Sequence, residues 1–367
     1  MLFEKTIPNH HTMTRIESIR KSFKKHGIDA FLVTNLTGIK YLTGFLGSAA
    51  VVLITKKNAY FITDFRYKTV VKDGLPSDYE VMISKQSSFE FLKKLIKKNK
   101  LKKIGFESTT LNYNAYLDLK ENYKAKFVPV SGLVESVAAV KEPYELDCLK
   151  KAIEISDKAF EHILAAIIPG KTTEKDLAAD ITYFQMKLGG EKNSFDPIVA
   201  SGENSALPHA HPTDRVIQYG DLLTLDYGTV YKGFNSDMTR TVAIGQISDD
   251  KRKIYEIVKE AQKRAVEAIK AGMVCKTVDA VARDFIRENG FGDNFGHGLG
   301  HGLGYDVHEA PGLNQFSKYK LKVNNVVTVE PGIYVEGLGG VRIEDDVVVT
   351  DDGCEILNKT TKDLVVL

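Results

Sequence analysis

Apolar positions along the first third of the chain alternate between the spacing of helices and that of strands. Residues at helical spacing are followed by a glycine stop, and short continuous apolar runs are typical of buried strands. The pattern predicts helices near 16–23 and 89–96 and strands at 29–33, 50–54 and 59–63. This order of elements predicts a mixed α/β domain.

A domain boundary is expected near Lys141. Pro143 suits the first turn of a helix, and helical spacing then continues over 144–168 as far as Pro169. A chain of 367 residues is long enough for two domains. We therefore place an N-terminal domain at 1–141 and a second domain at 142–367.

The second domain contains an internal repeat. The segment 222–228 (LLTLDYG) returns at 326–332 (VVTVEPG), and the segment 236–242 (SDMTRTV) returns at 343–349 (IEDDVVV). Apolar and polar positions alternate in these segments, which predicts strands. Turns near 232–233 and 338 would fold each copy into a hairpin, and we expect two matched halves that share one surface.

Each copy carries two carboxylates on one predicted strand face. Asp226 and Asp237 lie diagonally opposite each other if the first hairpin turns at 232–233, and we expect Glu330 and Glu344 to be related in the same way. A single aspartate is usually explained by a salt bridge or a turn. Four acids at repeat-equivalent positions in apolar strands would repel one another and lose hydration. We therefore predict that they bind cations.

Five of the nine histidines gather in two segments, 206–212 (ALPHAHP) and 296–308. Glycines at alternate positions of 296–304 let neighbouring backbones approach closely and leave the intervening histidines facing a cavity. This segment lacks the GxGxxG spacing of a phosphate-binding loop. We expect a metal or catalytic role for histidines of both segments, although His297 could merely support a neighbouring ligand and His211 could be a bystander.

Four carboxylates and one imidazole form a hard ligand set for two divalent cations. Such a set favours Mn(II), with Co(II), Fe(II) or Zn(II) as alternatives, over soft metals. Two cations roughly 3.5–4 Å apart can activate a shared water molecule and polarise a carbonyl group, as in aminopeptidases and other hydrolases. Histidines nearby that are not ligands would stabilise an oxyanion or transfer protons.

Composition mainly excludes other classes of protein. With 50 basic and 48 acidic side chains the formal charge is +2, which provides no dominant charge for nucleic acid or an anionic membrane. No apolar segment reaches the roughly 18 residues of a membrane helix, and the first residues lack the apolar stretch of a signal peptide. The three scattered cysteines form no CxxC pair. We expect a cytoplasmic protein that binds neither nucleic acid nor membrane.

In their order along the chain, the acids and histidines resemble the motifs of the creatinase/aminopeptidase P/prolidase family of pita-bread metallopeptidases. All five ligand positions of that family occur in order and in context, and the segment 41–44 (YLTG) resembles its N-terminal domain. The implied fold is α/β (α+β), with an N-terminal creatinase-like mixed domain followed by a pseudo-twofold pita-bread domain. The implied reaction is hydrolysis of the peptide bond between an N-terminal residue and a following proline.

The resemblance also implies a role for each site residue. The implied ligands of two divalent ions are Asp226, Asp237, His301, Glu330 and Glu344, of which Asp237 and Glu344 bridge the ions. His209 and His308 are implied to bind substrate and stabilise the tetrahedral intermediate, and His297 is a further candidate for substrate binding. Glu330 would also accept a proton. Arg342 would orient a ligand carboxylate, and a homodimer is implied as well.

Three alternatives differ in what they predict. A methionine aminopeptidase shares the catalytic fold but usually lacks so large an N-terminal domain. Creatinase shares the two-domain layout but lacks this set of acids. A non-catalytic pita-bread binding module would have broken ligand positions, and none is broken here. We therefore expect an enzyme.

The preferred length of the substrate depends on position 312. Several prolidases that resemble this chain carry an arginine directly after His-Glu-x-Pro, where it can pair with the free carboxylate of a dipeptide. Here 308–312 reads HEAPG, so Gly312 takes that place, although Arg342 or a residue of the N-terminal domain could substitute for the arginine. We expect an Xaa-Pro aminopeptidase acting on tripeptides and longer proline-containing peptides, with an Xaa-Pro dipeptidase (prolidase) as the alternative.

Overall fold

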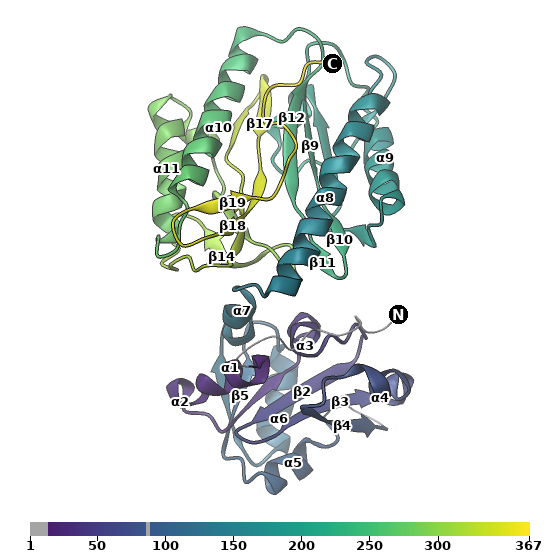
Figure 1. Ribbon diagram of the computed structural model, residues 1–367, viewed down its shortest axis with the longest axis vertical. Helices are drawn as coiled ribbons and strands as arrows, with labels where there is room; N and C mark the ends of the chain where they lie inside the picture. Colours follow the sequence, from purple (N-terminus) through teal and green to yellow (C-terminus); the bar gives the residue numbers. More distant parts are fainter. Residues whose placement is uncertain (1–13, 86–88) are drawn as a thin grey trace. The chain divides into compact units, whose positions relative to one another are not determined.

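The computed structural model describes residues 14–85 and 89–367. The chain divides into two compact units, the first ending at Ala138 and the second beginning at Ala139 (Figure 1). The first residues, on which the expectation about a signal peptide depends, lie outside the described residues. Among the helices of the described ranges, none is long and apolar enough to cross a membrane.

The first unit is a mixed six-stranded sheet with the strand order β4-β3-β2-β1-β5-β6. Its elements are α1 (Arg15–Lys21), α2 (Phe23–His26), β1 (Ala30–Val33), α3 (Leu36–Thr43), β2 (Ala50–Thr55), β3 (Ala59–Asp64), α4 (Val70–Gly74), β4 (Tyr79–Ser84), α5 (Leu92–Lys98), β5 (Lys103–Glu107), α6 (Tyr113–Asn122), β6 (Lys126–Val130) and α7 (Leu133–Ala138). Leu32 and Leu53 pack with Leu95 of α5 on one face, and Phe31 and Val52 of the opposite face are also buried. Both faces of the sheet are therefore covered.

The three predicted strands of the first unit are confirmed as β1, β2 and β3. The predicted helix at 16–23 is divided at Ser22 into α1 and α2. The helix predicted near 89–96 begins only at Leu92, so its apolar spacing starts before the helical hydrogen bonds do.

The second unit contains α8 (Pro143–Ala166), α9 (Glu174–Lys187), β7 (Lys192–Asn193), β8 (Ile198–Ser201), β9 (Leu222–Tyr227), β10 (Thr229–Tyr231), β11 (Phe234–Asn235), β12 (Met238–Ala243), α10 (Asp249–Ala268), α11 (Cys275–Glu288), β13 (Gly300–Gly302), β14 (Glu309–Leu313), β15 (Val326–Val329), β16 (Gly332–Val335), β17 (Gly339–Arg342), β18 (Asp345–Val349) and β19 (Cys354–Ile356). As predicted, Pro143 occupies the first turn of the long helix α8. The helix ends at Ala166, shortly before Pro169.

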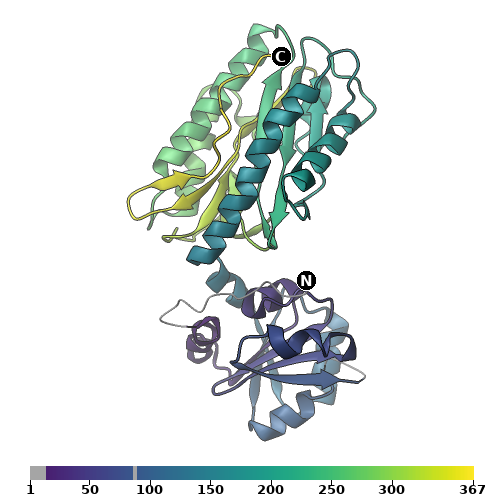
Figure 2. The ribbon, with the colours of Figure 1, turned by 45° about the vertical axis from the view of Figure 1, so that its right-hand side comes forward.

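Helix pairs pack against the strands of two matched halves. Figures 1 and 2 show α8 and α9 beside β9 and β12 of the first half. They show α10 and α11 beside the strands of the second half. Ile163 of α8 and Leu177 of α9 pack in one cluster with Leu225. Val258 of α10 packs in another cluster with Val327. Each half thus buries the apolar face of its strands beneath two helices, which leaves the polar strand faces available for a site.

The first acid-bearing hairpin has the predicted register. Lys232 and Gly233 have positive φ angles of 47° and 77° and connect the paired strands β10 and β11. Asp226 pairs with Thr239 across β9 and β12. Asp237 therefore lies diagonally opposite Asp226 and on the same face.

The second hairpin differs from the expectation. Val329 pairs with Asp345, and Gly332 pairs with Arg342. These flanking pairs place Glu330 directly opposite the residue before Asp345, Glu344, and not diagonally. The turn at 336–338 is one residue longer than the turn at 232–233, so the two hairpins cannot share one register. The two acids still lie on one face.

A buried ion pair connects the beginning of the second unit with β14. The ammonium group of Lys141 contacts the carboxylate of Glu309, and their side chains are only 2% and 13% exposed. The backbone N–H of Lys141 also donates to the carbonyl oxygen of Asn324 at 2.8 Å. Both interactions fix Lys141 within the second unit.

Replacing Lys141 by methionine should lower the free energy of unfolding by about 3–5 kcal/mol, because the carboxylate of Glu309 would stay buried without its cation. Urea denaturation measures this change. Lys150→Met is the matched control, since it removes the ion pair with Glu355 whose side chains are 44% and 56% exposed. The control should lose less than about 1 kcal/mol. Equal losses in the two variants would show that the Lys141 pair does not stabilise the fold.

Candidate metal centre

A cavity of about 540 Å³ in the second unit contains all the predicted site residues. Its acids, histidines and arginine are Asp226, Asp237, Glu330, Glu344, His209, His211, His297, His301, His308 and Arg342, together with the exposed Asp196. A larger groove of about 770 Å³ along α8 is lined by none of the predicted residues. The predicted chemistry is therefore concentrated in the smaller cavity.

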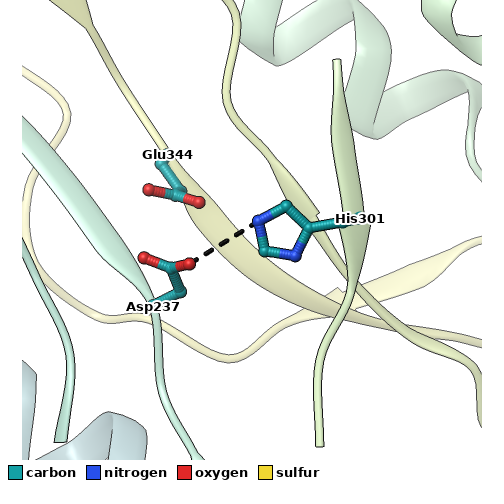
Figure 3. Close-up of side chains that lie close together, drawn as sticks. All are labelled: Asp237, His301 and Glu344. Carbon is teal, nitrogen blue, oxygen red and sulfur yellow. Dashed lines mark ion pairs between the residues drawn. The ribbon is translucent and has the colours of Figure 1, made fainter. Parts of the chain in front are cut away.

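Three of the side chains that line this cavity form a compact group. Ligand atoms of Asp237, His301 and Glu344 all lie within 4.8 Å of one another, among the residues that the structure describes. Figure 3 shows both carboxylates facing the imidazole ring, with Asp237 and His301 joined as an ion pair. The Nε2 atom of His301 lies 3.6 Å from Asp237 Oδ2 and 3.2 Å from Glu330 Oε1. These atoms are close enough to share a bound cation after small side-chain movements.

Close backbone approach places His301 in the cavity, as the glycine spacing predicts. A Cβ atom at Gly300 would lie 2.1 Å from the carbonyl oxygen of Thr328, and one at Gly302 would lie 2.3 Å from the carbonyl oxygen of Ala310. No side chain fits at either position. The Thr328 hydroxyl accepts the N–H of His301 at 3.1 Å and donates to Glu330 Oε1 at 3.1 Å. One threonine therefore orients both the histidine strand and an acid.

Thr239 and Arg342 form hydrogen bonds that fix the carboxylates of Glu344 and Asp226. The Thr239 hydroxyl donates to Glu344 Oε2 at 2.7 Å and accepts from Arg342 Nε at 3.1 Å. Arg342 is buried and donates from Nη2 to Asp226 Oδ2 and from Nη1 to the hydroxyl of Tyr334. A guanidinium held on both sides in this way fixes the orientation of the Asp226 carboxylate.

Together, the four predicted acids of the cavity have unpaired oxygen atoms and negative charges that suit divalent cations. Asp226 Oδ1 and Glu344 Oε1 are buried and have no hydrogen-bond partner among the described residues. Burial and then the charges of Glu344 and Asp226 raise the pKa of Asp237 well above its usual range. Burial and then the charge of Glu330 do the same to the pKa of Glu344. Cations would satisfy the free oxygens and remove the repulsion together.

The other histidines are arranged around the acids in different ways. The His308 ring is exposed and lies 4.3 Å from the His301 ring, centre to centre. Burial of part of the ring and then the charge of His301 lower the pKa of His308, which favours its neutral form. His209 lies exposed on the loop before β9. His297 lies 3.0 Å from the Tyr334 hydroxyl and 2.8 Å from the Gly298 carbonyl oxygen, so both of its ring nitrogens contact the protein.

Sequence reasoning did not identify several residues that support the acids, among them Thr239, Asp346 and Tyr334. Thr239 and Asp346 lie two positions after Asp237 and Glu344, so strand alternation would have placed them on the same faces. Asp346 Oδ2 accepts the backbone N–H of Asp237 at 3.1 Å. Tyr334 joins His297 to Arg342, but these partners are far apart in sequence. No local pattern signals such a residue.

Comparison with known proteins covers both units. Residues 147–351 match the profile of metallopeptidase family M24, and residues 15–140 match the creatinase/prolidase N-terminal domain. A solved structure of an Xaa-Pro dipeptidase from Bacillus anthracis is 47% identical, with a TM-score of 0.93 over 96% of this chain and 99% of that chain. An X-Pro aminopeptidase from Thermotoga maritima is 40% identical, with a TM-score of 0.85 over 95% of this chain and 100% of that chain. An Xaa-Pro dipeptidase of Pyrococcus furiosus is 36% identical over 96% of this chain and 99% of its own length.

Proposed function

The chain belongs to metallopeptidase family M24, with a creatinase/prolidase N-terminal domain, and from this premise we propose that it is an Xaa-Pro aminopeptidase. The family predicted from the sequence and the predicted fold class, a creatinase-like domain before a pita-bread catalytic domain, are both confirmed. Membership of a metallopeptidase family implies divalent metal ions. The reaction, the number of ions and the residue roles that follow belong to the proposal.

The observation that carries the proposal is the convergence of four carboxylates and one imidazole on a single cavity. Asp226, Asp237, His301, Glu330 and Glu344 would hold two divalent ions, with Mn(II) as the first choice for this oxygen-rich set. Ions bound there would polarise a carbonyl group and lower the pKa of a bound water molecule. Buried carboxylates with too few hydrogen-bond donors remain ionised only when cations offset their charge.

Side chains around the acids can bind the substrate and move protons. Burial alone would raise the pKa of Glu330, but the hydrogen bond and charge of His301 lower it, which keeps this carboxylate able to accept a proton. Neutral His308 can donate a hydrogen bond to the oxygen of the scissile carbonyl as charge develops there. His209 projects from a separate loop and can contact the substrate from another direction. His297 remains a further candidate for substrate contact.

Proline selectivity requires an apolar surface beside the acids. Phe195, Ile198 and Val307 line the same cavity. A proline ring fills such a surface without leaving a buried N–H group unpaired, because proline has none. A residue with a free N–H would lose a hydrogen bond to water on entering. We propose that these three side chains form the wall that favours proline after the scissile bond.

Position 312 has no positively charged side chain, which favours substrates longer than a dipeptide. Gly312 lies in β14 and lines the cavity, and a Cβ atom there would lie 2.9 Å from the amide nitrogen of Asn314. This place therefore contains a neutral amide and no guanidinium. A dipeptide has no specific partner here for its carboxylate, while a longer chain meets no unpaired charge. The names of relatives include both Xaa-Pro dipeptidases and an X-Pro aminopeptidase, so the measurement must decide.

We expect the Mn(II)-loaded enzyme to cleave an Xaa-Pro-Yaa tripeptide with a higher kcat/KM than the matched Xaa-Pro dipeptide. Met-Ala-Yaa peptides serve as the control for a methionine aminopeptidase and should be poor substrates. Gly312→Arg should shift the preference toward the dipeptide by about tenfold, the effect of one charge-assisted contact. Gly312→Met adds a side chain of similar length without charge and should not produce this shift. A strong dipeptide preference in the unmodified enzyme would make it a prolidase.

We also propose, from membership of the family, that the protein is a homodimer. The molar mass of the protein in solution tests this. A monomeric mass at the concentration of the activity assay would reject the homodimer without changing the proposed reaction.

A further inference from the structure

The loop that carries His209 has little regular structure of its own. This histidine loop, residues 202–213, leaves β8, makes one short 3₁₀ turn at 202–206 and returns past the cavity. Its tip touches the metal centre through the carbonyl oxygen of Pro208, which accepts from Arg342 Nη1 at 3.3 Å. Ser205 accepts the N–H of Gly340 at 2.8 Å. The position of His209 therefore depends on the contacts that hold the loop and not on regular secondary structure.

One buried carboxylate holds both ends of the histidine loop. Glu174, the first residue of α9, is fully buried. Its Oε1 accepts the N–H and the hydroxyl of Ser201, each at 2.7 Å. Its Oε2 accepts the N–H of Thr213 at 3.0 Å and the Thr213 hydroxyl at 2.6 Å. The amide of Asn204, inside the loop, lies 3.1 and 3.2 Å from the two oxygens.

The helix itself does not need this carboxylate. Thr173 caps α9, and Thr173 and Asp176 form a reciprocal capping box, with the Thr173 N–H donating to Asp176 Oδ2 at 2.9 Å. Asp176 is exposed to solvent at this end of the helix, while Glu174 points inward. A buried carboxylate is costly unless donors surround it. The donors that surround Glu174 all belong to the residues at or within the histidine loop.

We propose that Glu174 is a positioning residue that fixes the histidine loop so that His209 faces the substrate. It acts through the loop and touches neither substrate nor metal. Loss of its charge would remove its hydrogen bonds to both ends of the loop and loosen them, and a displacement of about 1 Å at a group that contacts substrate can lower turnover about 100-fold. The metal ligands lie on other segments, so the bound metal should not change. The role assigned to His209 rests on the proposed function.

Hydrogen exchange tests the structural half of this proposal without any substrate. In the full-length, metal-loaded protein, Glu174→Ala and the isosteric Glu174→Gln should speed amide exchange within 202–213 by about tenfold or more, the sign of local opening. Asp176→Asn is the matched control, because it weakens the cap of the same helix without touching the loop. The control should change exchange near residues 173–177 and leave the loop unchanged. Unchanged exchange in the loop of both Glu174 variants would overturn the proposal.

Kinetics test whether the loop acts through His209. Glu174→Gln should lower kcat/KM on an Xaa-Pro-Yaa peptide by about 10–100-fold at unchanged bound metal per chain, whereas Asp176→Asn should stay near the unmodified enzyme. Combining Glu174→Gln with His209→Ala should cost no more than His209→Ala alone, since both changes remove one interaction. Losses that multiply, or metal lost with Glu174, would overturn the proposal. If the unmodified enzyme cleaves no Xaa-Pro peptide, the proposed function fails, and hydrogen exchange still decides whether Glu174 holds the loop.

Discussion

Replacing Asp237 by alanine should remove both the bound metal and the peptidase activity. Asp237 is buried on the same strand face as Asp226 and lies within 4.8 Å, ligand atom to ligand atom, of His301 and Glu344. A carboxylate in this central position can bind two ions at once, so its loss affects the whole centre. The fall in kcat/KM should exceed the roughly 10–100-fold that residues behind a metal ligand typically cost. Elemental analysis of the purified variant, together with its kinetics, measures both effects.

Asp196→Ala provides the matched control for Asp237. Asp196 is an exposed acid that lines the same cavity outside the group of predicted ligands. Its replacement should leave the bound metal per chain unchanged, because a solvated carboxylate outside the cluster gains little from a cation. If Asp237→Ala keeps its metal and its activity, the acids of the two hairpins do not form the catalytic centre.

His301→Ala and His308→Ala should fail in different ways, although their rings are only 4.3 Å apart. His301 lies 3.2 Å from Glu330 and is held by Thr328, within the group of acids. Its loss should release metal first. His308 is exposed at the cavity and free to meet the substrate. Its loss should keep most of the metal and lower kcat about 10²–10³-fold, as the loss of one oxyanion donor does.

Metal content and kcat, measured on the same preparations, separate the two histidines. The expected pattern is low metal with low kcat for His301→Ala, and near-normal metal with low kcat for His308→Ala. Excess Mn(II) should rescue part of the activity of the first variant and none of the second, since only the first has a weakened site. Equal metal loss and identical kinetics would mean that ligand and substrate contact are not divided between these histidines.

The sequence alone predicts the elements whose pattern is local. The alternation in 222–228 and the turn residues Lys232 and Gly233 define the first hairpin, and its register follows from the turn length. The alternate glycines around His301 indicate close backbone approach, and the structure has it at Gly300 and Gly302. These signals depend on neighbours in the chain, so one sequence is enough to interpret them.

Interactions between distant segments were not predictable in this way. Asp226 and Asp237 lie 11 positions apart and Glu330 and Glu344 lie 14 apart, so the repeat shows that the second hairpin is longer. It does not show where the longer turn is centred, and that decides whether the two acids lie directly opposite each other. Tyr334 joins His297 to Arg342 only after three segments have packed together. From the sequence, Glu174 is an ordinary acidic residue in the first turn of a helix. Only the structure shows that it contacts Ser201 and Thr213. Residues that support a site from another element have no spacing signature.

Titration of metal-free protein with Mn(II) tests the central claim most directly. Exhaustive chelation should abolish cleavage of an Xaa-Pro-Yaa peptide. Activity should return as metal is added and should reach its maximum at about two ions per chain. The Asp237→Ala variant should show no recovery over the same range. Full activity in the exhaustively chelated, metal-free protein would contradict the account, because the acids of the two hairpins would then have no part in catalysis.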